Sequence, residues 1–138
     1  MTRTLFAFPG MDAALAQAKK AFDLGHVPVG AALVQEDKVV FEEHNRAHPI
    51  EHAEMNILRL CSRPLDTCDL YVTLQPCTMC AKAIEIMRVR RLYFGAYQRD
   101  FRMEGQFFHT QVIGGIYETA CQSLLTAFFE RKRSVSCC

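Results

Sequence analysis

The order of apolar strands and helices is the feature of this chain that most limits its fold. Apolar, β-branched residues predict strands at 27–34 and 38–43, and the polar 35–37 segment between them predicts a hairpin. Beyond the hairpin, helical and strand patterns alternate along the chain. A hairpin followed by alternating units predicts a three-layer α/β/α sandwich on a mixed five-stranded sheet.

The remaining elements follow from periodicity and from residues that stop helices. Gly25 ends the first helical pattern, and Pro64 prevents a long extension of the second. The stretch 97–111 predicts no clear element. The expected helices cover 11–24, 51–60, 77–88 and 117–131, and the later strands cover 70–74, 91–96 and 112–113.

Length and composition exclude several classes of protein. A chain of 138 residues that is 50% hydrophobic predicts a single domain, residues 1–138, with a buried core. No apolar run approaches the ~18 residues of a membrane span, and the first ten residues lack the apolar core of a signal peptide. We therefore expect a protein without membrane contact, in a reducing, cytoplasmic compartment.

The net charge of +1 gives no overall attraction to nucleic acid, but the charges are unevenly distributed. Acidic residues dominate 36–54, whereas basic residues dominate 82–102 and the cluster 131–133. Two basic stretches on one face would bind phosphates. Charge alone leaves this equal to an ordinary solvated helix surface.

Two short segments suggest a metal site. Cys77 and Cys80 are three residues apart at the start of a predicted helix, so their thiols project from one face. Two thiolates on one turn form half of a tetrahedral zinc site, and a helix N-terminus favours their ionised form. His52, at the start of another predicted helix, supplies a third ligand. Three protein ligands leave the fourth position for water, as in catalytic zinc sites.

A fourth cysteine ligand would make the zinc structural instead. Cys61 would lie ~13 Å beyond His52 on a continuous helix, which makes it a poor ligand. Cys68, near the start of a strand, stays open. A lone CxxC pair also marks redox dithiols, but the proline before Cys77 and the upstream His-x-Glu favour a catalytic metal site.

Glu54 follows the metal histidine by two residues and is not needed as a ligand. A carboxylate there can take a proton from water and return it to a leaving amine. His-x-Glu followed by Pro-Cys-x-x-Cys resembles the signature of zinc nucleobase deaminases, in which the glutamate is the general acid and base.

The similarity extends over most of the chain. Segments 28–31, 52–54, 70–74, 76–81 and 92–96 resemble the bacterial tRNA-specific adenosine deaminases, within the zinc-dependent cytidine and deoxycytidylate deaminase superfamily. The resemblance implies a homodimer that converts the wobble adenosine of an anticodon to inosine. It also implies roles for the following residues: Asn45, Pro28, Val29 and Pro76 at the base, and Arg131 and Arg133 at the RNA.

Several segments depart from that family. The segment before His52 is shorter, Gln75 replaces a usual glutamate, and a lysine-bearing loop after Ala96 is missing. These departures lie around the substrate pocket, so a deaminase of a free base or nucleotide, of guanine or cytosine type, is the alternative function. A non-catalytic, zinc-stapled binding module is the second alternative, although it would not need Glu54.

The predicted helix 77–88 also bears on assembly. Its apolar residues lie on more than one face, which a single sheet cannot cover. We therefore expect a homodimer with contacts near the site; loops that cover the second face within a monomer are the alternative.

Overall fold

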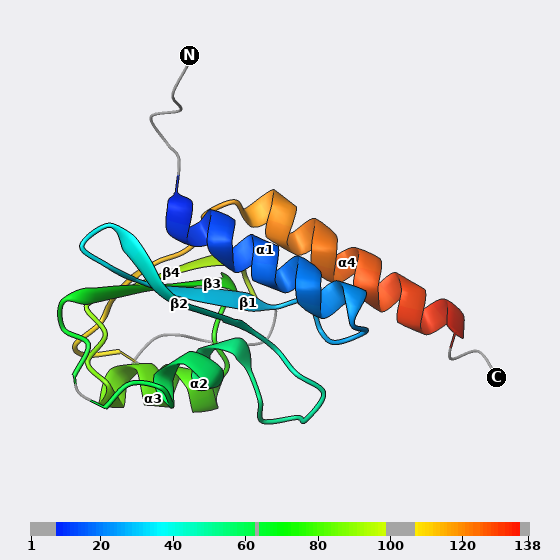
Figure 1. Ribbon diagram of the computed structural model, residues 1–138. Coiled ribbons are helices and arrows are strands. Elements are labelled where there is room, and N and C mark those ends of the chain that lie inside the picture. Colours follow the sequence, from blue (N-terminus) through cyan, green and yellow to red (C-terminus); the bar gives the residue numbers. More distant parts are fainter. Residues whose placement is uncertain (1–7, 63, 99–106, 136–138) are drawn as a thin grey trace, which may run out of the picture.

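Three layers form the protein, which confirms the predicted α/β/α sandwich. Helices α1 (Pro9–Asp23) and α4 (Glu118–Val135) lie on one face of the sheet, and α2 (Ala53–Leu58) and α3 (Thr78–Ile86) lie on the other (Figure 1). This computed structural model describes residues 8–62, 64–98 and 107–135, with side chains up to residue 132. No helix within these ranges is both long and apolar enough to cross a membrane.

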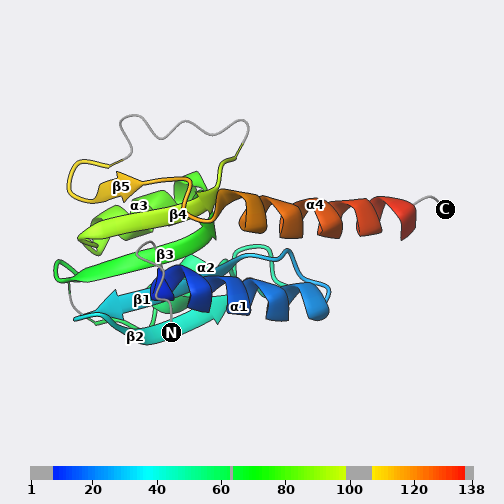
Figure 2. The same cartoon turned by 90° about the horizontal axis from the view of Figure 1, so that it is seen from above.

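The sheet is mixed and has five strands in the order β2-β1-β3-β4-β5 (Figure 2). β1 is antiparallel to β2 and β3, whereas β3, β4 and β5 are parallel. Consequently β1 begins where β2, β3 and β4 end, and we call this side of the sheet the site edge. The strands are β1 (Gly30–Gln35), β2 (Lys38–His44), β3 (Cys68–Leu74), β4 (Arg91–Ala96) and β5 (Gln111–Ile113).

The hairpin turn is tighter than predicted. Gln35 pairs with Lys38, so only Glu36 and Asp37 form the turn. Both have positive φ, at 51° and 63°, as a two-residue turn of type I′ requires. The strand prediction was wrong for 27–29, which precede β1 and lead the chain to the site edge.

Close packing of α1 on β1 fixes the position of residues 27–29, which lead into β1. A Cβ atom on Gly30 would lie 2.0 Å from the backbone oxygen of Ala14, so only glycine fits there. The helix presents small buried residues to the sheet, among them Ala14 and Ala18. Gly25, with φ of +80°, ends α1 and turns the chain toward β1.

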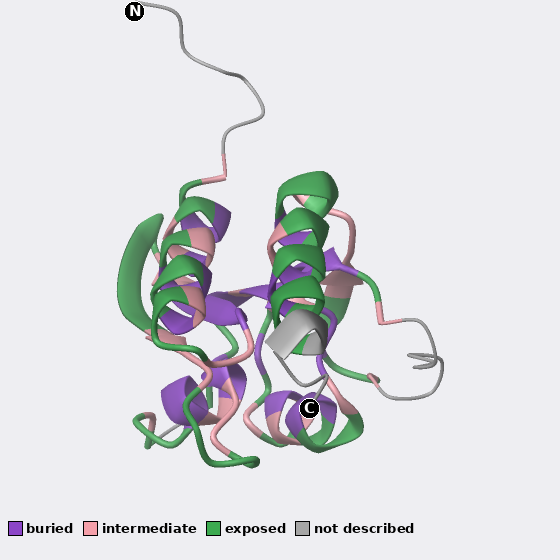
Figure 3. Ribbon diagram, turned by 90° about the vertical axis from the view of Figure 1, so that its right-hand side faces the viewer, coloured by how far each residue is buried: buried purple, intermediate pink, exposed green. Residues whose placement is uncertain are grey.

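The core lies between the sheet and the inward faces of all four helices (Figure 3). Burial of these apolar side chains is the main favourable term that orders the three layers. The larger members from the helices and strands are Met11, Leu33, Ile57, Leu70, Ile84 and Leu92. α2 ends at Leu58, before the predicted Leu60, and α3 ends at Ile86 rather than Arg88.

Candidate active site

The three predicted metal ligands meet at the site edge. His52 immediately precedes α2, Cys77 immediately precedes α3, and Cys80 lies in the first turn of α3. The Nδ1 atom of His52 lies 3.5 Å from the sulfur of each cysteine. Neither His52 nor Cys77 caps its own helix with its side chain, so both side chains face the shared centre.

This geometry fits zinc. The three ligand atoms all lie within 4.8 Å of one another. Tetrahedral bond lengths of ~2.05 Å to nitrogen and ~2.3 Å to sulfur require an N···S separation of about 3.6 Å. In the described part of the chain no fourth ligand joins the group, and Cys68 begins β3, at the opposite edge of the sheet. The arrangement is therefore that of a zinc ion with one open position.

The two thiols differ in their charge. A hydrogen bond from Cys80 lowers the pKa of the Cys77 thiol to about 5. The same bond, together with burial, raises the pKa of Cys80 above its ordinary value. The hydrogen bond between the two sulfur atoms therefore favours the ionised form at Cys77, and a zinc ion would bind both cysteines as thiolates.

Glu54 lies beside the ligands on the first turn of α2, and its side chain is only 3% exposed. Burial raises the pKa of Glu54 to about 7, and the nearby His52 only partly opposes this shift. A carboxyl group with a pKa near neutrality can both accept and donate a proton at physiological pH. Its position and burial suit a general acid and base.

The residues expected at the base gather at the same edge. Asn45 follows the end of β2, and its backbone N–H donates to the oxygen of Val29 at 3.0 Å. The side-chain oxygen of Asn45 accepts the N–H of Ala53 at 2.8 Å, which fixes the amide next to the metal histidine. Pro28, Val29 and Pro76 are buried around this edge.

The predicted RNA contacts are only partly described. Arg131 stacks on the Phe22 ring at 4.4 Å and donates to the backbone oxygen of Phe22. The side chain of Arg133 lies outside the described residues. The side chain of Arg131 thus extends from α4 onto α1, and whether either arginine contacts RNA stays a prediction.

Sequence reasoning missed a basic and aromatic cavity beside the site. It has a volume of about 430 Å³ and includes Arg46, His26, Phe129 and Lys132 in its lining. The sequence offered one indication of this cavity, because the basic residue Arg46 directly follows Asn45, the residue expected at the base. The ring Nδ1 of His26 is buried without a partner in the described structure.

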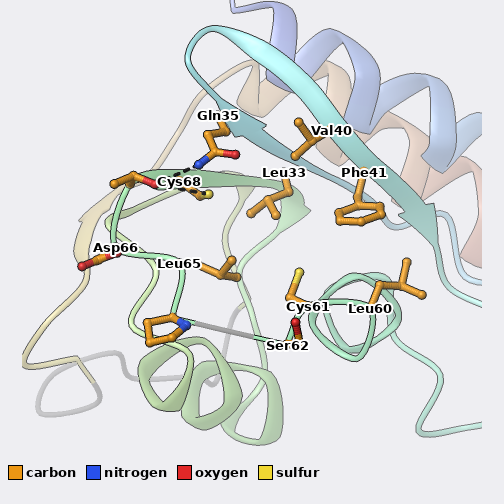
Figure 4. A pocket seen from close by; sticks show the side chains of 12 residues that line it. Leu33, Gln35, Val40, Phe41, Leu60, Cys61, Ser62, Leu65, Asp66 and Cys68 are labelled. Atoms are coloured by element: carbon orange, nitrogen blue, oxygen red, sulfur yellow. Dashed lines mark hydrogen bonds between the residues drawn. The ribbon is translucent and has the colours of Figure 1, made fainter.

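A second cavity, of about 560 Å³, lies at the opposite edge of the sheet (Figure 4). Gln35 at the end of β1 and Thr67 before β3 are hydrogen bonded beside it. Phe41 and Leu60 line its apolar part. Because β1 ends and β3 begins there, this cavity is separate from the metal ligands.

Comparison with known proteins agrees with the site. Residues 9–96 match the family model of the cytidine and deoxycytidylate deaminase zinc-binding region. The chain is 35% identical to the tRNA-specific adenosine deaminase of Bacillus subtilis, over 89% of this chain and 88% of the relative. The corresponding enzyme of Agrobacterium fabrum is also 35% identical, over 89% and 93%.

Solved structures show the same fold. One from a study of A-to-I editing by tRNA:A34 deaminases has a TM-score of 0.77 at 34% identity, covering 85% of this chain and 99% of that one. A guanine deaminase from Nitrosomonas europaea also reaches 0.77, at 22% identity over 91% and 86%, and shares the fold. The chain belongs to the zinc-binding cytidine and deoxycytidylate deaminase family, within the group of the tRNA-specific adenosine deaminases.

Proposed function

We propose that this zinc-dependent hydrolase deaminates the wobble adenosine of a tRNA anticodon to inosine. The observation that carries the proposal is the His52–Cys77–Cys80 group with buried Glu54 beside it, on a chain 35% identical to tRNA-specific adenosine deaminases. A binding module stapled by zinc would need neither the open position nor the buried carboxyl group. The guanine deaminase shares the fold at lower sequence identity, which favours the adenosine reaction.

Deamination exchanges an amino group for oxygen and therefore requires proton transfers. His52, Cys77 and Cys80 would hold a zinc ion, which would supply a Lewis acid able to lower the pKa of water to about 7. The Glu54 carboxylate takes a proton from the attacking water. It passes this proton to the ring nitrogen as the water oxygen bonds to the ring carbon. It then takes the proton of the new hydroxyl group and passes it to the amino group, which leaves as ammonia when the C–N bond breaks. The burial of Glu54 keeps this transfer away from bulk solvent.

Asn45 is oriented to hold the base. Its side-chain oxygen already accepts the N–H of Ala53, so its Nδ2 group remains to donate to an acceptor on the base. Pro28, Val29 and Pro76, which are buried beside it, would back the wall against which the ring lies. These contacts select a planar base at the metal, and the amide donor fixes its orientation.

The cavity that contains Arg46 and Lys132 supports an RNA substrate. Arg46 pairs with Glu43 at 2.8 Å, and the Lys132 ammonium lies over the Phe128 ring. Arg46 and Lys132 can bind a phosphate, and the half-exposed ring of Phe129 can stack on an unpaired base. We propose that this cavity holds a nucleotide next to the target, with Arg46 and Lys132 as phosphate contacts in addition to Arg131 and Arg133.

An uncovered apolar surface supports the homodimer. In the described residues, Ile86 on α3 is 66% exposed and Phe108 is 86% exposed. Glu85 accepts the backbone N–H groups of Phe108 and Thr110, which holds this segment against α3. Met79 extends the surface toward the metal site. We propose that a second copy covers it; sedimentation as a monomer at micromolar concentration would contradict this.

The substrate can be tested directly. Zinc-loaded protein is offered an anticodon stem-loop with adenosine at the wobble position and, separately, guanine, cytosine and their nucleotides. Inosine in the RNA and ammonia release are the readouts, with Glu54→Gln as the inactive control. We expect turnover of the stem-loop alone. Turnover restricted to a free base or nucleotide would reject the tRNA substrate and retain the deaminase.

A site built on two thiolates is best preserved in a reducing compartment, so we propose that the enzyme works in the cytoplasm.

A further inference from the structure

A pair of glutamines links the metal-binding turn to the end of β4. The backbone N–H of Gln98 donates to the side-chain oxygen of Gln75 at 2.8 Å. In return, the side-chain Nε2 of Gln98 donates to the backbone oxygen of Gln75 at 2.7 Å. The backbone N–H of Gln75 donates to Ala96 at 2.8 Å. Three hydrogen bonds therefore join residue 75 to 96–98.

These bonds lie where the metal-binding turn has few other means of support. β3 ends at Leu74 and α3 begins at Thr78, so only Gln75, Pro76 and Cys77 connect them. Pro76 has no N–H group and cannot donate a hydrogen bond. Gln75 is only 5% exposed, and buried polar side chains with paired hydrogen bonds hold a specific local arrangement.

We propose that Gln75 is a positioning residue for deamination, and that Gln98 is its partner. Together they hold the 75–77 turn so that Pro76 stays under the base and Cys77 keeps its thiolate and backbone N–H directed at the reacting centre. An N–H at a helix N-terminus stabilises negative charge that develops on the substrate oxygen. The inference rests on the proposed function for the choice of substrate, whereas its second measurement, the rate of zinc release, does not depend on that function.

The direction of the bonds makes the two positions unequal. Gln75 supplies only acceptors to Gln98, and Gln98 supplies only donors. Gln75→Glu therefore keeps every bond, because a carboxylate oxygen accepts the N–H of Gln98. Gln98→Glu loses the Nε2 donor and sets a carboxylate against the backbone oxygen of Gln75. The same change, glutamine to glutamate, is therefore expected to be neutral at position 75 and damaging at position 98.

The test compares Gln75→Glu, Gln98→Glu and Gln75→Leu with the unaltered chain. Steady-state kinetics on the anticodon stem-loop and zinc release to a chromogenic chelator are measured for each. We expect Gln98→Glu and Gln75→Leu to lower kcat about tenfold, the scale of one or two lost hydrogen bonds, with KM changed less than about twofold. Zinc content stays at one ion per chain, but zinc release is about tenfold faster. Gln75→Glu stays within about twofold of the unaltered chain on every measure.

Exposed Gln122, on α4, provides the control, since Gln122→Leu should leave kcat and zinc release unchanged. The proposal is overturned if Gln98→Glu behaves like the unaltered chain, or if Gln75→Glu is as defective as Gln75→Leu. If Gln75→Leu does not fold, the two glutamate variants decide alone. If the unaltered chain does not act on the RNA, the proposed function fails, and the pattern of zinc release still decides the role of the pair.

Discussion

At the scale of single residues, the proposed chemistry depends on Glu54, which lies beside the three ligand residues and is not one of them. Glu54→Gln preserves the shape of the side chain and removes its ability to accept a proton. We expect zinc content and folding to be unchanged and kcat to fall by at least ~10²-fold, the scale of a lost general acid and base. Metal analysis and single-turnover kinetics measure both. Near-normal turnover would remove Glu54 from the mechanism.

Asn45 combines an observed hydrogen bond to Ala53 with a proposed hydrogen bond to the base. Asn45→Asp keeps the acceptor for the N–H of Ala53 but loses the donor to the base. Asn45→Ala loses both. We expect both variants to raise KM, whereas only Asn45→Ala lowers the free energy of unfolding, by ~1 kcal/mol, because the N–H of Ala53 at the start of α2 loses its acceptor. Urea unfolding beside kinetics tests this; equal destabilisation by the two variants would contradict it.

At the scale of elements, the metal joins the starts of two helices on one face of the sheet. α2 has only six residues and is too short to be stable alone. We therefore expect its stability to depend on packing against the core and on metal binding by His52, which immediately precedes it. We expect a chelator to speed amide exchange in α2 and in the first turn of α3, with α1 and α4 little changed. Exchange measured by mass spectrometry, with zinc added back as the control, would show this. Uniformly faster exchange would mean that the metal stabilises the whole fold instead.

At the scale of the whole molecule, the site edge combines the metal centre with the cavity that contains Arg46 and Lys132. Each phosphate contact with a single strand contributes ~0.7 to the slope of log affinity against log salt. Lys132→Gln and Arg46→Gln should each make the salt dependence of binding to an anticodon stem-loop shallower by about this amount. Lys38→Gln, at the opposite edge, should leave it unchanged. Equal slopes in all the variants would place the RNA elsewhere.

The three layers and the metal ligands could be predicted from the sequence, because both depend on local patterns. Helical and strand periods are visible within one element, and the spacing of Cys77 and Cys80 places them on one helical turn. Contacts between residues far apart in the chain could be seen only once the fold was known. The fold set Cys68 at the opposite edge from the metal, turned Arg131 onto Phe22, and paired Gln75 with Gln98. Contacts of this kind join residues from separate elements, and they leave no periodic pattern in the chain, because strand order and packing bring them together.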